Sequence, residues 1–166
     1  MTLPRTIALA VVLLAAAPAR AQLANRSIAL ESSLSAPLRA GEGAVGGLAL
    51  VATTWLDGEL EALARLAFGA GARTRDRAAA GEAWTGTAGV RLSLAPGPLR
   101  PQVALEVGWR RTVAPGGGTQ GAAVLGAGIG LEWFPARDLS LALRGGVRGA
   151  GGGPELDASL AAAAYF

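Results

Sequence analysis

The sequence predicts an all-β fold, an eight-stranded antiparallel up-and-down transmembrane β-barrel. Apolar residues alternate with polar or very small ones along eight segments, and each segment has about the 9 to 12 residues that a tilted membrane-crossing strand requires. All four tryptophans lie near the ends of these segments. After the N-terminal region, no run of 18 apolar residues offers a membrane-spanning helix.

The composition fits one domain whose stability does not come from a core of large side chains. Of 166 residues, 51% are hydrophobic, yet only 5% are aromatic and 25 are glycine. The chain has no cysteine, which excludes the disulfides that small exported domains commonly use. It has no histidine, so the commonest transition-metal ligands are absent. We therefore expect neither a metal site nor a cofactor.

The N-terminus has the three-part pattern of a signal peptide. Arg5 precedes an apolar run from Ile7 to Ala17, and Ala19-Arg20-Ala21 then provides the small residues that signal peptidase accepts. This apolar run is too short for a spanning helix. We expect residues 1–21 to be a cleaved signal peptide and residues 22–166 to form the barrel.

Cleavage would leave the charge of the mature chain almost balanced. The whole chain has 15 basic residues, all arginine, and 12 acidic ones. The signal segment contains Arg5 and Arg20, and their removal leaves 13 basic residues against 12 acidic ones. No basic surplus remains that would predict a nucleic-acid partner.

Six segments show the alternation clearly, with one apolar face and one face that is polar, charged or tiny. They are residues 59–68, 84–94, 102–110, 123–133, 139–148 and 155–166. In the third of them, for example, Leu105 and Val107 flank Glu106. Two earlier segments are weaker, and in the second of these either face could be the apolar one; they are residues 28–38 and 45–56. Together they give eight strands.

Short turns and longer loops alternate between these segments. If the chain starts on the periplasmic side, the inner turns are at residues 57–58, 95–100 and 135–138, and the outer loops are at residues 39–43, 71–83, 114–120 and 149–154. Asp57-Gly58 suits a two-residue hairpin. An even number of strands returns the C-terminus to the periplasmic side, as membrane barrels of this kind do.

The aromatic residues predict two lipid-facing girdles, because amphipathic rings prefer the level of the lipid headgroups. Phe68, Trp84 and Trp109 lie at the outer ends of the expected strands. Trp55, Trp133 and Phe166 lie at the periplasmic ends. A soluble β-sandwich would more often have a tryptophan in the middle of its core.

The chain resembles the small eight-stranded outer-membrane barrels of the OmpA/OmpX type. The resemblance covers the mature chain and rests on the signal pattern, the eight strands, the turn sequence around Trp133–Leu141 and the terminal Phe166. It implies that the barrel-assembly machinery reads the last strand through an alternating pattern that ends in an aromatic residue. Leu160, Ala162, Ala164 and Phe166 match this pattern. The resemblance does not extend to cell-wall anchoring, because no peptidoglycan-binding domain follows the barrel.

Eight charged residues lie on the face of the expected strands that is opposite to the lipid-facing one. They are Glu61, Arg65, Arg91, Glu106, Arg110, Glu132, Arg144 and Asp157. An arginine that faces lipid at the bilayer midplane costs about 2–4 kcal/mol, so we expect these side chains to point inward. An eight-stranded barrel is only wide enough for side chains to fill. Four acids and four arginines could then pair in a ladder that plugs the lumen.

A basic cluster lies on the longest outer loop, where Arg73, Arg75 and Arg77 could meet lipopolysaccharide phosphates. Asp76 and Glu82 dilute this cluster, and such charges on a loop are usually just solvated. The partners we expect are outer-membrane lipid and lipopolysaccharide, with the assembly machinery during biogenesis. We expect a monomer in the outer membrane of a Gram-negative bacterium.

The sequence does not predict an enzyme, because it lacks the histidine and lysine that would activate a nucleophile. We expect an integral outer-membrane β-barrel with a structural or surface-interaction role, whose lumen is not a bulk pore. Two alternatives remain open at this point. One is a narrow channel for ions or small solutes, and the other is a soluble periplasmic β-barrel that binds a small apolar ligand.

Overall fold

The structure is a computed structural model that describes residues 25–38, 44–72, 80–113, 116–150 and 153–166. The expected signal peptide lies outside these residues, as do the arginines of the 71–83 loop. No helix in the described part of the chain is long and apolar enough to cross a membrane.

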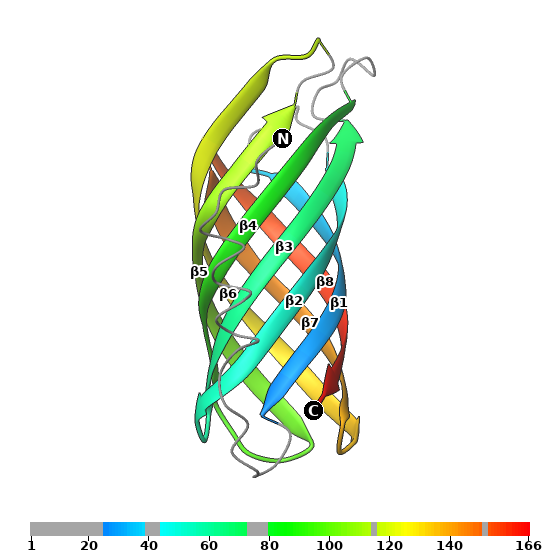
Figure 1. Ribbon diagram of the computed structural model, residues 1–166, viewed down its shortest axis with the longest axis vertical. Coiled ribbons are helices and arrows are strands. Elements are labelled where there is room, and N and C mark those ends of the chain that lie inside the picture. Colours follow the sequence, from blue (N-terminus) through cyan, green and yellow to red (C-terminus); the bar gives the residue numbers. More distant parts are fainter. Residues whose placement is uncertain (1–24, 39–43, 73–79, 114–115, 151–152) are drawn as a thin grey trace.

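Eight strands form one closed barrel in which each strand pairs antiparallel with its neighbours in sequence, and β1 pairs with β8 (Figure 1). This is the predicted fold class. The strands are β1 (Arg26–Pro37), β2 (Val45–Asp57), β3 (Leu60–Ala72), β4 (Ala80–Ser93), β5 (Leu99–Val113), β6 (Thr119–Ala136), β7 (Leu139–Ala150) and β8 (Gly153–Tyr165). Closure leaves the barrel wall without a free edge along most of its height.

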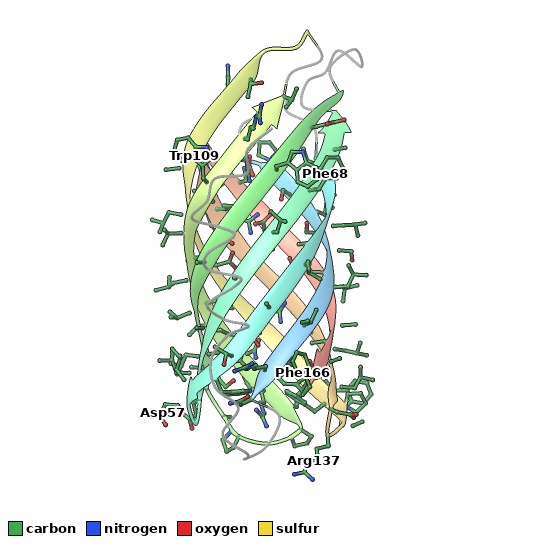
Figure 2. All side chains as sticks on the ribbon, in the orientation of Figure 1. Asp57, Phe68, Trp109, Arg137 and Phe166 are labelled. Atoms are coloured by element: carbon green, nitrogen blue, oxygen red, sulfur yellow. The ribbon has the colours of Figure 1, made fainter. Side chains whose placement is uncertain are left out.

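The period-2 alternation of the sequence separates the two faces of the wall, because successive side chains of a strand point to opposite sides. Side chains project outward around the whole wall (Figure 2). The large apolar ones are among them, and Ile129, for example, is 71% exposed. Polar and small side chains point inward, and Glu132 on the same strand is 0% exposed. For β2, which the sequence left undecided, Val51 is inside and Leu50 is outside.

Short turns and the C-terminus lie at one end of the barrel, which we call the turn end; the opposite end is the loop end (Figure 1). The β2–β3 hairpin turns at Gly58-Glu59, one residue later than predicted, because Asp57 still pairs with Leu60. The Asp57 carboxylate accepts a 2.8 Å hydrogen bond from the Gly58 amide and so stabilises the turn.

The β5–β6 hairpin rises above its neighbours at the loop end (Figure 1). Pairing of β6 with β7 begins at Leu125 and Gly149, whereas pairing of β6 with β5 extends to Thr119. The stretch Thr119–Val124 therefore has β5 on one side and no paired strand on the other among the described residues.

Candidate functional site: the polar lumen

The interior of the barrel contains a set of buried charges that no soluble core of this size would normally hold. Six acids and five arginines of the described residues point inward. They are Glu31, Glu61, Glu106, Glu132, Glu155, Asp157, Arg65, Arg91, Arg110, Arg144 and Arg148. Because an unpaired buried charge is costly, their partners determine what the lumen can do.

Aromatic side chains occupy the lumen at the turn end. Tyr165 belongs to a buried cluster with Ala29, Val51 and Ala163, and Trp55 and Phe134 pack against it. The ring centroids of Phe134 and Tyr165 are 5.3 Å apart. The Arg100 guanidinium carbon lies 4.5 Å from the centroid of Phe134 and 5.4 Å from that of Trp55. We call Trp55, Phe134 and Tyr165 the aromatic lid.

Glu132 lies beside the aromatic lid and accepts hydrogen bonds from three uncharged side chains. The Tyr165 hydroxyl donates to Oε1 at 2.9 Å, and the Ser140 hydroxyl donates to the same oxygen. The Gln102 amide donates to Oε2 at 2.5 Å. The carboxylate is thus held by β5, β7 and β8 without an arginine.

Two groups of ion pairs occupy the middle of the lumen. Arg91 Nη1 lies 3.1 Å from Glu61 Oε2, and both side chains are almost completely buried. Glu31 forms ion pairs with two arginines: its Oε1 is 2.8 Å from Arg65 Nη2, and its Oε2 is 3.1 Å from Arg144 Nη1. One carboxylate of β1 thereby connects β3 with β7 across the lumen.

The pairs toward the loop end involve two acids near the start of β8. Arg148 Nη1 is 2.8 Å from Asp157 Oδ2, and Ser35 donates a hydrogen bond to the same carboxylate. Arg110 Nη1 is 2.6 Å from Glu155 Oε1. These contacts connect β1, β5 and β7 to β8, the strand that closes the barrel.

All eight residues of the predicted ladder lie in the lumen, but they do not pair with one another as the sequence suggested. Of the five ion pairs in the described chain, only Arg91–Glu61 joins two residues of the predicted set. The remaining pairs use Glu31, Glu155 and Arg148, which the prediction omitted. The inward parity of Glu155 and Arg148 was visible in the sequence, whereas Glu31 lies in a segment whose alternation was weak.

Glu106 and Glu132 depart from the ladder in another way, since neither forms an ion pair in the described chain. Glu106 accepts a 2.6 Å hydrogen bond from the Thr87 hydroxyl, and the three donors to Glu132 are uncharged. The predicted ion pairs of Glu106 and Glu132 are wrong because the stagger of the strands determines which side chains lie at the same height in the lumen. The alternation of the sequence does not encode this stagger.

Five of the six predicted girdle residues are on the outer wall. Phe68 and Trp109 lie near the loop end and Phe166 at the turn end (Figure 2), while Trp84 and Trp133 are about half exposed. Trp84 packs on Phe68, with ring centroids 4.7 Å apart. Trp55 is the exception and corrects the prediction: β2 presents its odd-numbered residues to the interior, so Trp55 belongs to the aromatic lid.

The four residues of the expected assembly signal share one face of β8. Leu160, Ala162, Ala164 and Phe166 all point outward, in phase with the other lipid-side residues of this strand. Phe166 exchanges two backbone hydrogen bonds with Arg26, of 2.9 and 3.2 Å, at the β1–β8 seam.

Two small cavities remain between the charged side chains. The first, of about 60 Å³, lies in the middle of the lumen beside the glycine-rich wall of β6 and β7. The second, also about 60 Å³, continues toward the loop end and shares Arg65 and Arg148 with the first. The described residues contain no group of three or more acids placed to hold a metal ion.

An antiparallel barrel with an apolar exterior, two ends of aromatic residues and a charged interior is the fold of the eight-stranded outer-membrane β-barrels. No family model matches the chain, and no curated protein matches it by sequence. Solved structures do match it by fold, at sequence identities that are too low to show more than the fold.

Three of these structures are barrels of nearly the same length. Neisserial surface protein A aligns with a TM-score of 0.67 at 10% identity, over 85% of this chain and 96% of its own. Ail, the attachment invasion locus protein of Yersinia pestis, aligns with a TM-score of 0.57 at 13% identity, over 87% and 99%. The N-terminal barrel domain of Pseudomonas aeruginosa OprF has a TM-score of 0.57 at 17% identity, over 84% and 97%.

Proposed function

We propose that this chain is an integral outer-membrane protein whose lumen is closed and whose loop end interacts with other molecules at the cell surface. The observation that supports a location in the membrane is that the barrel has apolar side chains outside and charged ones inside, the reverse of a soluble protein. Outward-facing side chains such as Leu125, Ile129 and Leu143 are more than half exposed, while charges lie inside. In water this arrangement would expose a large apolar surface, and in a bilayer it places that surface against lipid.

Cell fractionation tests the membrane location directly. We expect the protein in the outer-membrane fraction, and we expect its electrophoretic mobility in cold detergent gels to change after boiling, as that of a closed barrel does. Recovery of the folded protein from the soluble periplasmic fraction would instead support the alternative of a soluble barrel that binds an apolar ligand.

The closed lumen is supported by what lies along the barrel axis. The aromatic lid blocks the turn end, and Glu61–Arg91 and Arg65–Glu31–Arg144 cross the middle. The two cavities between these groups have room for only a few water molecules each. A hydrated ion would have to displace several ion pairs to pass, which favours a plugged barrel over a channel.

Conductance in planar bilayers distinguishes the plugged barrel from a narrow channel. For the purified native barrel we expect no steady current above that of the protein-free bilayer. A steady open current that Glu106→Ala or Arg144→Ala abolishes would show that the lumen charges line a conducting path, and the plugged barrel would then be wrong.

A surface-interaction role is supported by the free edge of β6. Among the described residues, no strand pairs with the β7 side of Thr119–Val124 above the wall, and its sequence Thr-Gln-Gly-Ala-Ala-Val contains no charge and no proline. Natural edge strands that avoid partners usually carry such residues. The edge therefore suits an extended segment of another polypeptide, which would add to the sheet through main-chain hydrogen bonds. Two of the similar barrels are named as a surface protein and an attachment protein.

A peptide with the sequence of residues 108–113 tests this edge, because these residues already pair with 119–124 from the other side. We expect the labelled peptide to bind the barrel in lipid nanodiscs, and we expect a copy methylated on alternate amide nitrogens to lose that binding. The variant Gln120→Pro should weaken binding, whereas Gln120→Ala should not. Equal binding of the two peptides would contradict edge pairing.

A further inference from the structure

The β2–β3 hairpin contains the only Asp-Gly dipeptide of the sequence, Asp57-Gly58. Both residues are exposed, and Figure 2 shows Asp57 at the turn end of the barrel. In such a dipeptide the amide nitrogen of the second residue can attack the side-chain carboxyl carbon of the first. Glycine favours this attack because it has no side chain to shield the nitrogen. The tip of the hairpin therefore has the residue types for a covalent change of its own backbone.

The folded hairpin holds the two reacting groups side by side. The Gly58 amide nitrogen lies 2.8 Å from Asp57 Oδ1, so the nucleophile is already next to the carboxyl group. A Cβ at Gly58 would meet no atom within 4 Å, so the space around this nitrogen is open. Water reaches both residues because they are exposed.

An irregularity in β2 separates Asp57 from the regular wall. The register of β2 against β3 shifts between Trp55 and Asp57, and Leu56 faces no residue of β3. Beyond this bulge the two strands form only the pair of Asp57 with Leu60. On its other side the Trp55 amide donates a 2.9 Å hydrogen bond to the Asn25 carbonyl. The backbone at Asp57 can therefore rearrange while the strand before the bulge stays in place.

We propose that Asp57 of the folded barrel converts slowly to isoaspartate through a cyclic succinimide. The Gly58 nitrogen forms a bond to the side-chain carboxyl carbon of Asp57. The hydroxyl of the protonated carboxyl group and the amide hydrogen leave together as one water molecule. Water then adds to one of the two ring carbonyls and breaks its bond to the nitrogen. Opening at the main-chain carbonyl gives isoaspartate, and opening at the side-chain carbonyl restores aspartate.

The product has a longer turn but the same barrel. Isoaspartate routes the backbone through the side chain and so adds one methylene group between the α-carbon of residue 57 and the Gly58 nitrogen. We expect the pair with Leu60 to be lost and the strands before the bulge to stay paired. This inference is independent of the closed lumen and of the β6 edge, because it depends only on the geometry of the turn.

Incubation of the folded barrel in detergent at physiological temperature, followed by peptide mapping, tests the proposal. Aspartyl and isoaspartyl peptides of equal mass separate by chromatography, and trypsin places the two exposed turn aspartates in different peptides, 40–65 and 138–144. Asp138 is the internal control, because it lies in an exposed turn but precedes Leu139. We expect isoaspartate to accumulate severalfold faster at Asp57 than at Asp138.

Two variants should shift the rate in opposite directions. Gly58→Ala adds a methyl group beside the nitrogen; the φ of Gly58 is not positive and its surroundings are open, so this variant should fold with an unchanged unfolding midpoint. It should accumulate severalfold less isoaspartate. Asp57→Asn forms the same ring with loss of ammonia, which leaves more readily than water here. It should therefore yield aspartate and isoaspartate at position 57 faster than the native chain yields isoaspartate.

Cold detergent gels of the incubated protein show whether the modified chain is folded. We expect isoaspartate at position 57 in the band of the folded barrel. Its confinement to the unfolded band would mean that the hairpin protects Asp57, and the proposal would then be wrong. Equal accumulation at Asp57 and Asp138, or in the native chain and Gly58→Ala, would also overturn it.

Discussion

The hydroxyl of Tyr165 on β8 donates a 2.9 Å hydrogen bond to the carboxylate of Glu132 on β6, across the inner face of β7. Ser140 of β7 donates to the same oxygen, so one buried carboxylate holds three consecutive strands at the turn end. The neighbouring residue Phe166 faces outward and bonds to Arg26 of β1. The C-terminal end of β8 is therefore bonded to the lumen through Tyr165, and Phe166, the next residue, is bonded to β1.

Tyr165→Phe removes the hydroxyl and leaves the ring in the aromatic lid. Because the acceptor is a buried carboxylate, we expect the free energy of unfolding to fall by about 1.5–3 kcal/mol. Urea unfolding followed by tryptophan fluorescence measures this change. Ser32→Ala is the matched control, because its hydroxyl makes only an exposed 3.5 Å contact with the Leu160 carbonyl and should cost less than about 0.5 kcal/mol. Equal effects of the two variants would contradict the role of Tyr165.

The pair Glu61–Arg91 should behave as a coupled unit. Either Glu61→Gln or Arg91→Met breaks a pair whose members are 0% and 4% exposed, and each should cost about 3–5 kcal/mol. The double variant should recover part of the loss, because it leaves no uncompensated charge. Urea unfolding of the four proteins gives the coupling energy. Strictly additive costs would show that the two side chains do not interact.

Substitution by alanine should impair folding at one lumen glycine, Gly108, and leave it unaffected at another, Gly126. A Cβ on Gly108 would lie 2.0 Å from the Gly86 carbonyl oxygen, which is backbone and cannot move freely, whereas a Cβ on Gly126 has no neighbour closer than 3.8 Å. Gly108→Ala should therefore reduce the folded fraction on cold detergent gels, and Gly126→Ala should leave it unchanged. The opposite order would mean that the wall around Gly108 is wider than this structure shows.

Phe166→Ala tests the expected assembly signal. Phe166 is 61% exposed on the outer wall, so its truncation removes few contacts within the folded barrel. We expect the unfolding midpoint of the refolded variant to change little, while the amount inserted into the outer membrane of cells falls severalfold. Quantitative blotting of membrane fractions measures the second effect. Normal insertion together with a lower midpoint would assign Phe166 a structural role instead.

The alternation of apolar and polar residues was sufficient to predict which side chains face inward along most of the barrel wall. The alternation around Glu106 and around Glu132 placed these residues inside, and the tryptophans marked the strand ends. It failed for Trp55, where a continuous apolar run hid the parity of β2. It also placed the Asp57-Gly58 turn one residue early. The error at Trp55 arises because the run from Leu48 to Ala52 offers no polar residue to distinguish the two faces.

The sequence by itself determined that eight strands would alternate and, outside the weakly alternating β1 and β2, which residues would face inward, because side-chain direction along a strand depends only on its period of two. Only the tertiary structure decided that Arg65 meets Glu31, that Arg110 meets Glu155 and that Tyr165 meets Glu132. These partners lie on strands that are not neighbours in sequence. Their heights in the lumen follow from strand tilt and stagger, which are fixed when the sheet closes.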